Sequence, residues 1–335
     1  MPLLKAVAVP AALAVAATLF SGCASEDRLT IYSGRSQDII EPILVDFAEE
    51  TGIDIDVRYG DSTDLALLIA EEGEQSPADV FLSQSPGAVG FLDQQDLLAE
   101  LDPATLDRVA EDNRASDGNW VGISGRVRVL VYNTDDVDPA TLPDSVLDLT
   151  DPEYEGDVAL APENASFQDF VTAMRSELGD DVAQEWLEGM ADNDAPTYAN
   201  NTAIVEAVGR GEVPMGLVNH YYNVRAQAED PGVPSENYTF PDGDIGSLLI
   251  VTAASALGSS DRQEDATALI DFLLSEAAQE FYSEETFEYP LAAGVEPAAG
   301  LPPLDSLAVD TVDFNELGGG LERTRELIEE SGFEG

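Results

Sequence analysis

The sequence has very few of the side chains on which most enzyme chemistry depends. Its 335 residues include one cysteine, one histidine and, at Lys5, one lysine. A single cysteine excludes a disulfide framework and a zinc site built from thiolates. A chain with no lysine after position 5 has neither a P-loop lysine nor a Schiff-base lysine. The one histidine, His220, has no Gly-x-Ser-x-Gly turn to partner in a Ser-His triad. We therefore expect a protein that is not an enzyme.

Positive charge is almost as scarce. The chain has 14 Lys and Arg against 67 Asp and Glu, which gives a net charge of −53. So strong a negative charge makes nucleic acid and anionic membrane surfaces poor binding partners, and we expect no nucleic-acid partner. The 44% hydrophobic content nevertheless indicates a globular protein. The roughly 310 residues after Cys23 are enough for two lobes with separate cores, because single cores stop growing near about 250–300 residues.

Long apolar runs are absent apart from one at the N-terminus. Ala6–Phe20 follows a positively charged start, is too short to span a bilayer and ends in small residues, so it predicts a signal peptide over residues 1–22. Phe20-Ser21-Gly22-Cys23 resembles a lipobox, which predicts a lipid anchor on Cys23 and a tether over residues 23–27. Several acyl chains hold a protein firmly on a membrane. We expect an exported protein on the outer face of the cell membrane or in the periplasm. The alternative is an ordinary signal peptide with an incidental cysteine.

Beyond the tether, strand and helix patterns alternate. Apolar periodicity predicts strands at 29–32, 53–59 and 79–82, with helices at 38–51 and 62–72 between them. Short links between such elements indicate a parallel, right-handed α/β unit. Further strands are expected at 120–123, 127–132, 215–218 and 248–252, and further helices at 167–178, 181–190, 202–208, 264–274, 277–283 and 321–331. The fold class is therefore α/β.

Polar residues gather where one buried strand ends. The apolar run Met215–Val218 is followed at once by Asn219-His220-Tyr221-Tyr222. In open α/β sheets, ligands bind at the carboxyl ends of the strands. The phenolates of Tyr221 and Tyr222 would be hard, anionic donors that suit ferric iron. Taken alone, the dipeptide favours a packing role at the start of a helix.

Five motifs carry a resemblance to a known family. They are Ile31-Tyr32-Ser33-Gly34-Arg35, Ser76-Pro77-Ala78-Asp79-Val80-Phe81, Ile123-Ser124-Gly125-Arg126, Asn219-His220-Tyr221-Tyr222 and Glu288-Tyr289-Pro290-Leu291. In this order and at these separations the sequence resembles the ferric-iron-binding proteins of ABC importers, which have the type II periplasmic-binding-protein fold. The resemblance covers nearly the whole mature chain. It implies two lobes, each a mixed, mostly parallel sheet flanked by helices, with a ligand cleft between them. It also implies ABC permease and ATPase subunits as partners, and we expect a monomer.

The resemblance also suggests how the chain is divided. We expect residues 28–128 to form the first part of lobe 1, residues 129–250 to form lobe 2, and residues 251–300 to return to lobe 1. Residues 301–335 are expected to form a C-terminal helical segment that packs on lobe 2. The chain would cross between lobes near Val127–Val131, near Leu249–Thr252 and once more near Leu301.

Site residues follow from the same resemblance. Tyr221 and Tyr222 match the family's paired iron-ligating tyrosines. The loop at 162–167 matches the one that holds a synergistic anion such as carbonate or phosphate, and N–H groups at a helix start favour an anion. The expected anion-binding residues are Asn164, Ala165, Ser166, Asn201 and Asn219.

Two positions depart from the family pattern. Ser36 and Gln84 stand where the best-known members add a histidine and a glutamate as iron ligands. Tyr32 and Tyr59 are candidate replacements at strand ends, with packing as the alternative. Carbonate, citrate or water would otherwise complete the coordination sphere. Arg35 and Arg126, beside glycines, are candidates to receive an anion by bidentate bonds, with inter-lobe ion pairs as the alternative.

The sequence therefore supports three hypotheses. The leading one is an extracytoplasmic solute-binding lipoprotein that captures Fe³⁺, with carbonate, phosphate or citrate beside it, and delivers it to an ABC-type importer. The second is a binding protein of the same fold for an organic anion, a phosphonate or a polyamine, which the loss of both first-lobe ligands favours. The third, a secreted hydrolase or adhesion protein, is disfavoured by the single histidine and the absence of repeats.

Overall fold

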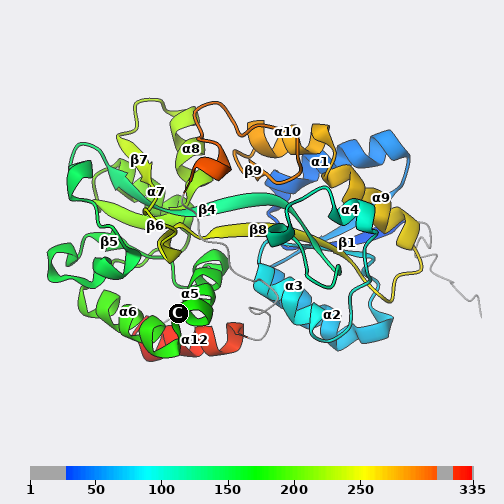
Figure 1. Ribbon diagram of the computed structural model, residues 1–335, viewed down its shortest axis with the longest axis horizontal. Helices are drawn as coiled ribbons and strands as arrows, with labels where there is room; N and C mark the ends of the chain where they lie inside the picture. Colours follow the sequence, from blue (N-terminus) through cyan, green and yellow to red (C-terminus); the bar gives the residue numbers. More distant parts are fainter. Residues whose placement is uncertain (1–27, 308–319, 334–335) are drawn as a thin grey trace, which may run out of the picture.

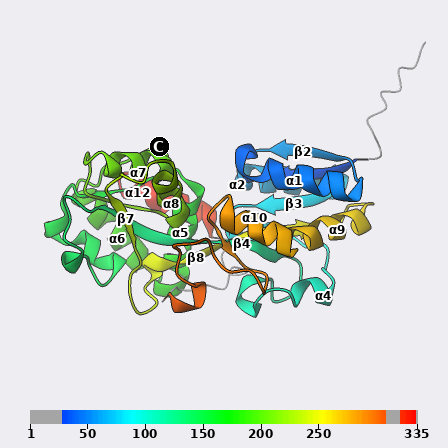
Figure 2. The ribbon, with the colours of Figure 1, turned by 90° about the horizontal axis from the view of Figure 1, so that it is seen from above.

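Two strands that cross the molecule join its two lobes. The computed structural model describes residues 28–307 and 320–333. Figure 1 shows the lobes side by side, with β4 (Val121–Asn133) and β8 (Leu249–Ala256) running between them. Figure 2 shows the same arrangement from above. The predicted signal peptide, the tether and the lipid anchor at Cys23 lie outside the described residues.

The first lobe is built on parallel strands. The central strand β1 (Leu29–Ser33) pairs in parallel with β2 (Ile55–Tyr59) and with β3 (Val80–Ser83), and β3 pairs antiparallel with β8. Helix α1 (Gln37–Thr51) buries apolar residues at helical spacing. It ends at Gly52, whose φ of 73° lets its N–H bond back to Ala48. Only glycine adopts this backbone conformation without strain, so Gly52 ends the helix predicted at 38–51.

The second lobe is built around β6 (Met215–Asn219). This strand pairs in parallel with β5 (Val158–Ala159) and antiparallel with β4, and β4 also pairs antiparallel with β7 (Ser235–Tyr238). The helices of this lobe are α5 (Ala165–Leu178), α6 (Asp180–Asp192), α7 (Asn201–Gly209) and α8 (His220–Glu229). The rings of Phe167, Phe170 and Trp186 pack together, with centroids 5.5 to 6.2 Å apart, and hold α5 against α6.

The remaining elements complete both lobes. They are α2 (Ser62–Glu72), α3 (Pro86–Asp93), α4 (Pro103–Leu106), α9 (Gln263–Leu273), α10 (Glu276–Glu284), β9 (Tyr289–Pro290) and α12 (Leu321–Glu330). Short 3-10 segments lie at Gly73–Gln75, Glu111–Asn113, Pro139–Thr141, Val146–Thr150, Pro152–Tyr154, Ile245–Ser247 and Leu304–Ser306. In the part of the chain that the structure describes, no helix has the length and apolar character to span a membrane.

The two-lobe α/β fold class with mixed sheets is confirmed, but the strand directions need a correction. Parallel pairs are confined to β2-β1-β3 and to β5-β6, whereas β4, β7, β8 and β9 all join their neighbours antiparallel. The sheets are therefore mixed rather than mostly parallel. The physical reason is the crossing itself, because β4 runs from the first lobe to the second and β8 runs back.

Strand β4 changes partners along its length. Its first half, Val121 to Val127, pairs with β8, and its second half, from Arg128 onward, pairs with β6. The strands expected at 120–123 and 127–132 are thus one continuous strand. Arg126 and Arg128 stand at the change of partner, where the two lobes meet.

The C-terminal part of the chain returns to the second lobe. Leu301, Leu304 and Leu307 pack against the apolar cluster around β6 and α7. Helix α12 lies on α5 and α6 (Figure 1), and the Thr172 and Thr324 hydroxyls there are 2.7 Å apart. Across from it, α2 and α3 of the first lobe complete a groove of about 810 Å³.

Candidate functional site

Tyr221 and Tyr222 lie in the first turn of α8, where β6 has just ended. Their rings stack with centroids 4.1 Å apart and planes inclined by 29°. The side chain of Tyr221 is 1% exposed, and that of Tyr222 is half-buried. Neither phenol hydroxyl is hydrogen-bonded to any residue that the structure describes. Stacking and burial therefore fix the two rings, and their hydroxyl oxygens form no hydrogen bond with the described residues.

Three buried arginines interact with the tyrosine pair through their charges. Arg35 comes from the end of β1, and Arg126 and Arg128 come from β4. The charges of Arg35 and Arg126 act on Tyr221, and that of Arg128 acts on Tyr222. Each arginine has N–H groups without a hydrogen-bond partner among the described residues: Nε and Nη1 of Arg35 and Arg126, and Nη2 of Arg128. Buried donors left unpaired are costly, and a guanidinium pairs best with a planar or phosphate-like anion.

The other N–H groups of these arginines fix their positions. Arg35 forms an ion pair with Glu288, a fully buried carboxylate that also accepts from the Ser124 hydroxyl at 2.5 Å. Arg126 donates to the carbonyl oxygens of Gln84 and Val251. Arg128 donates to Oδ1 of Asn219 at 3.3 Å and lies over the Phe170 ring, which is 5.6 Å away.

The protonation of the site follows from its burial. Burial raises the pKa of Tyr221 well above its usual value, Tyr222 adds to this effect, and Arg35 and Arg126 oppose it. The buried Tyr221 phenol therefore keeps its proton until a metal cation displaces it. Burial lowers the pKa of Arg128 to about 9, against the opposite influence of Tyr222 and Asp169. For Arg35, burial acts to lower the pKa, but Glu288 and the tyrosines together raise it.

The expected anion-binding loop forms a hydrogen-bonded cluster. Asn164 is the N-cap of α5, and its Oδ1 accepts from the Ser166 N–H at 3.1 Å and from the Ser166 hydroxyl at 2.6 Å. Asn201, at the start of α7, donates to the same oxygen at 3.2 Å. The structure therefore brings Asn164, Ala165, Ser166 and Asn201 together, and Asn219 reaches Arg128 instead.

The candidate first-lobe ligands lie elsewhere. The Tyr32 hydroxyl donates to Glu72 and accepts from Arg58, at 3.3 Å each. Burial and the negative charge of Glu41 on α1 both raise the pKa of Tyr59. Both tyrosines thus contact first-lobe residues, and their ligand role stays a prediction. Ser36 is exposed and makes no capping bond.

The sequence did not predict a role for His220 at the site, yet its ring bonds to backbone groups of two other segments, at Val127 and Phe287. The Val127 N–H donates to Nδ1 at 3.1 Å, so Nε2 carries the proton and donates to the Phe287 carbonyl at 2.9 Å. Phe287 has a φ of 60°, a strained conformation for a large residue. Burial lowers the pKa of His220 to about 4, so the ring is neutral near pH 7.

Arg128 was also missed by the sequence analysis, although its spacing of two from Arg126 places both residues on one face of a strand.

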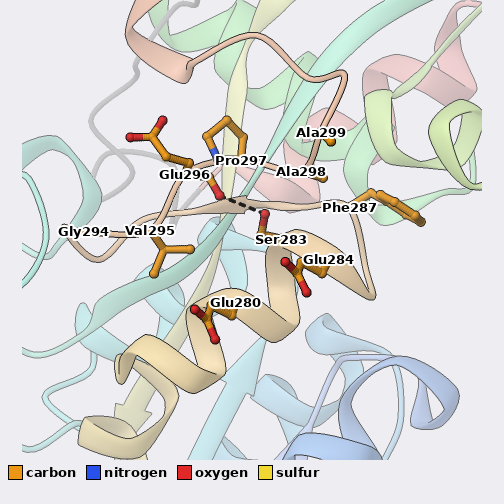
Figure 3. A pocket seen from close by; sticks show the side chains of 10 residues that line it. All are labelled: Glu280, Ser283, Glu284, Phe287, Gly294, Val295, Glu296, Pro297, Ala298 and Ala299. Atoms are coloured by element: carbon orange, nitrogen blue, oxygen red, sulfur yellow. Dashed lines mark hydrogen bonds between the residues drawn. The ribbon is translucent and has the colours of Figure 1, made fainter.

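A separate hollow lies beside α10. It has a volume of about 490 Å³ and is lined by Glu280 and Glu284 from the helix and by Glu296 from the following loop (Figure 3). The Ser283 hydroxyl donates to the Glu296 carbonyl at 2.9 Å. Among the described residues no cationic side chain lines this hollow, in contrast to the tyrosine site with its three arginines. Within the described residues, no group of three His, Cys, Asp or Glu side chains could hold a metal ion.

Comparisons with known proteins find relatives over most of the chain. Residues 75–316 match the model of the bacterial extracellular solute-binding proteins. The chain belongs to this family. It is 34% identical to the Fe(3+)-binding periplasmic protein of Serratia marcescens, with 92% of each chain covered. It is 30% identical to a major ferric iron-binding protein of Neisseria meningitidis, with 95% of this chain and 97% of the relative covered. The predicted resemblance to ferric-binding proteins is confirmed.

Solved structures show the same fold. Iron-bound HitA from Pseudomonas aeruginosa superposes with a TM-score of 0.86 at 33% identity, covering 91% of this chain and 99% of that one. A Trichodesmium protein in complex with iron and citrate ligands superposes with a TM-score of 0.80 at 26% identity, covering 92% and 100%. This solute-binding protein therefore shares its architecture along nearly its whole described length.

Proposed function

We propose that this protein captures ferric iron together with an anion outside the cytoplasm and delivers it to an ABC-type importer. The observation that carries the proposal is the stacked pair Tyr221 and Tyr222, with free phenol oxygens, among three buried arginines that have unused N–H groups. The relatives named as ferric iron-binding and periplasmic proteins support the same cargo. They are named as binding proteins, in agreement with the expected absence of enzyme activity.

The tyrosines would bind the metal as phenolates. Each phenol gives up its proton as the oxygen bonds to Fe³⁺, a hard acid that prefers anionic oxygen donors. Because burial raises the pKa of Tyr221, the site holds protons when empty and exchanges them for the metal. Arg35 and Arg126 favour the phenolate form and reduce the cost of that exchange.

An anion would complete the site. Two tyrosines supply only part of a ferric coordination sphere, and Ser36 and Gln84 replace the family's first-lobe ligands. Carbonate, phosphate or citrate would take the unused N–H groups of the three arginines and lie against the start of α5, where Asn164, Ser166 and Asn201 cluster. The relative solved with iron and citrate supports an organic anion in this role.

The export signal and anchor belong to the same proposal. The lipobox-like Phe20-Ser21-Gly22-Cys23 supports acylation of Cys23, which would keep a monomeric binding protein at the outer face of the membrane, beside its permease and ATPase subunits. Effective concentration at the permease would then be set by the tether.

Titration with ferric citrate tests the cargo. Wild-type protein should develop a tyrosinate-to-iron charge-transfer colour. Tyr221→Phe and Tyr222→Phe each remove one donor oxygen and keep the ring, so the fold should survive while ferric affinity falls and the double variant stays colourless. Wild-type affinity in the double variant would mean that the pair only packs. The arginines would then favour an organic anion or a phosphonate as ligand, because a polyamine would meet three buried cations.

A further inference from the structure

Ser85 and Asp169 form a side-chain hydrogen bond between the two lobes. Ser85 is the N-cap of α3 in the first lobe, and Asp169 is in the second turn of α5 in the second lobe. These two helices face each other in Figure 1. The Ser85 hydroxyl donates to Oδ1 of Asp169 at 2.5 Å. Ser85 is 2% and Asp169 is 3% exposed, so the contact excludes water.

The carboxylate of Asp169 depends on this bond. Its second oxygen, Oδ2, has no hydrogen-bond partner in residues 28–307 and 320–333. Arg126 and Arg128 face it from β4 with opposite charge, and Asp61 faces it from the start of α2 with like charge. Burial raises the pKa of Asp169 to about 7, and the Ser85 hydroxyl and the two arginines only partly offset that rise. The carboxylate is therefore poorly solvated, and Ser85 supplies its hydroxyl partner.

The bond exists only while the lobes are together. The two residues are 84 positions apart, and their helices belong to lobes that β4 and β8 connect. If the lobes separate, water solvates both side chains, so the bond favours the closed arrangement only by its net energy, as the Ser85 hydroxyl offsets part of the cost of burying the carboxylate. Hydrogen bonds to ionised acceptors are about twice as strong as neutral ones. The loop that presents Ser85 is also fixed, because Arg126 donates to the carbonyl of the preceding Gln84.

We infer that Ser85 and Asp169 are a latch that holds the lobes closed over the ligand and sets how slowly the ligand leaves. The inference uses the proposed function in choosing ferric ion as the probe. It concerns retention rather than coordination, because neither residue is one of the tyrosines that carry the colour.

Release kinetics test the latch. Protein loaded with ferric citrate is mixed with excess EDTA, and loss of the charge-transfer colour gives the release rate. Ser85→Ala and Asp169→Ala should each release iron about tenfold faster or more, as expected for a hydrogen bond to a charged group. The position of the colour band should not change. The double variant should release no faster than the single ones, because both changes remove the same bond.

A matched control separates the latch from helix capping. Ser85 also accepts from the Ala88 N–H at 3.4 Å, and Ser275 caps α10 in the same way, accepting from Ala278 at 3.3 Å. Ser275→Ala should therefore keep the wild-type release rate. The inference is overturned if Ser275→Ala speeds release as much as Ser85→Ala, if both single variants release at the wild-type rate, or if their effects add in the double variant.

Small-angle X-ray scattering separates failure of the latch from failure of the proposed cargo. Without any ligand and at pH 5.5, where closure no longer carries the cost of a buried charge, Asp169→Ala should show a larger radius of gyration than wild type, because the bond to Ser85 is lost and the lobes spend more time apart. Equal radii would reject the latch whatever the cargo is. If wild-type protein gives no colour with ferric citrate, the proposed function fails, and the scattering result alone decides on the latch.

Discussion

Arg126 and Arg128 stand two residues apart on β4, and each donates to a different lobe. Arg126 reaches the Gln84 carbonyl in the first lobe, and Arg128 reaches the Asn219 side chain in the second. Because β4 changes from β8 to β6 between these residues, the two guanidiniums mark the boundary between lobes. The N–H groups that they leave unpaired among the described residues therefore lie where the two lobes meet.

Replacing one of these arginines should weaken binding through the anion. In Arg128→Gln, the loss of Nη2 should lower ferric affinity about ten- to a hundredfold when carbonate is present. Equilibrium titration at several carbonate concentrations measures this. Wild-type affinity should rise with carbonate, and the variant should respond little. Arg210→Gln is the control, because Arg210 is an exposed residue paired with Glu206 and Glu212. An unchanged carbonate dependence in Arg128→Gln would contradict an anion at the arginines.

Lobe closure without ligand should become stronger as the pH falls. The pKa of Asp169 is about 7 in the closed arrangement and lower when water surrounds the carboxylate. The closed form therefore binds the proton more tightly, and closure should be favoured as the pH drops from about 7 toward 4. Scattering at pH 8 and pH 5.5 should show a smaller radius of gyration at the lower pH. Asp169→Asn, which cannot ionise, should have the same radius at both, and a persistent pH effect there would point to another group.

Loss of His220 should destabilise the fold. His220→Ala leaves the Val127 N–H and the Phe287 carbonyl without their buried partners, so the free energy of unfolding should fall by about 2–3 kcal/mol. Urea unfolding followed by circular dichroism measures the change. A variant that unfolds at the wild-type urea concentration would show that water replaces the ring without loss.

Cys23 should decide whether the protein stays on the membrane. With acylation, the wild type should sediment with membranes, and Cys23→Ala should appear in the soluble fraction after export. Immunoblotting of both fractions measures this. Equal partition of the two proteins would leave an ordinary signal peptide as the better interpretation of the N-terminus.

Local pattern predicted the elements well where apolar residues repeat. The spacing of Ile40, Leu44 and Phe47 located α1, and Gly52 located its end. Helix α3 was missed because Pro86–Asp93 is rich in small residues and has little periodicity. Strand β4 was divided in two because Ser124-Gly125-Arg126 has little strand propensity, and pairing with β8 and β9 keeps it extended.

The site was predicted in part for the same reason. Tyr221 and Tyr222 could be found because they follow a buried strand directly. The ion pair of Arg35 with Glu288 joins residues 253 positions apart, and no local pattern connects them. Asp169 looked like one polar residue of an amphipathic helix, and its partner Ser85 comes from the other lobe. Contacts of this kind depend on how the lobes meet.

The groove between α12 and the first lobe offers two labelling positions from which the opening of the two lobes can be measured. Leu67 of α2, which is 52% exposed, and Glu326 of α12 line it from opposite sides. Because α12 is attached to α5 and α6, it moves with the second lobe, and α2 moves with the first. A pair of fluorophores at these two positions would thus report the distance between the lobes, and with it each closing event, without any label near the tyrosines.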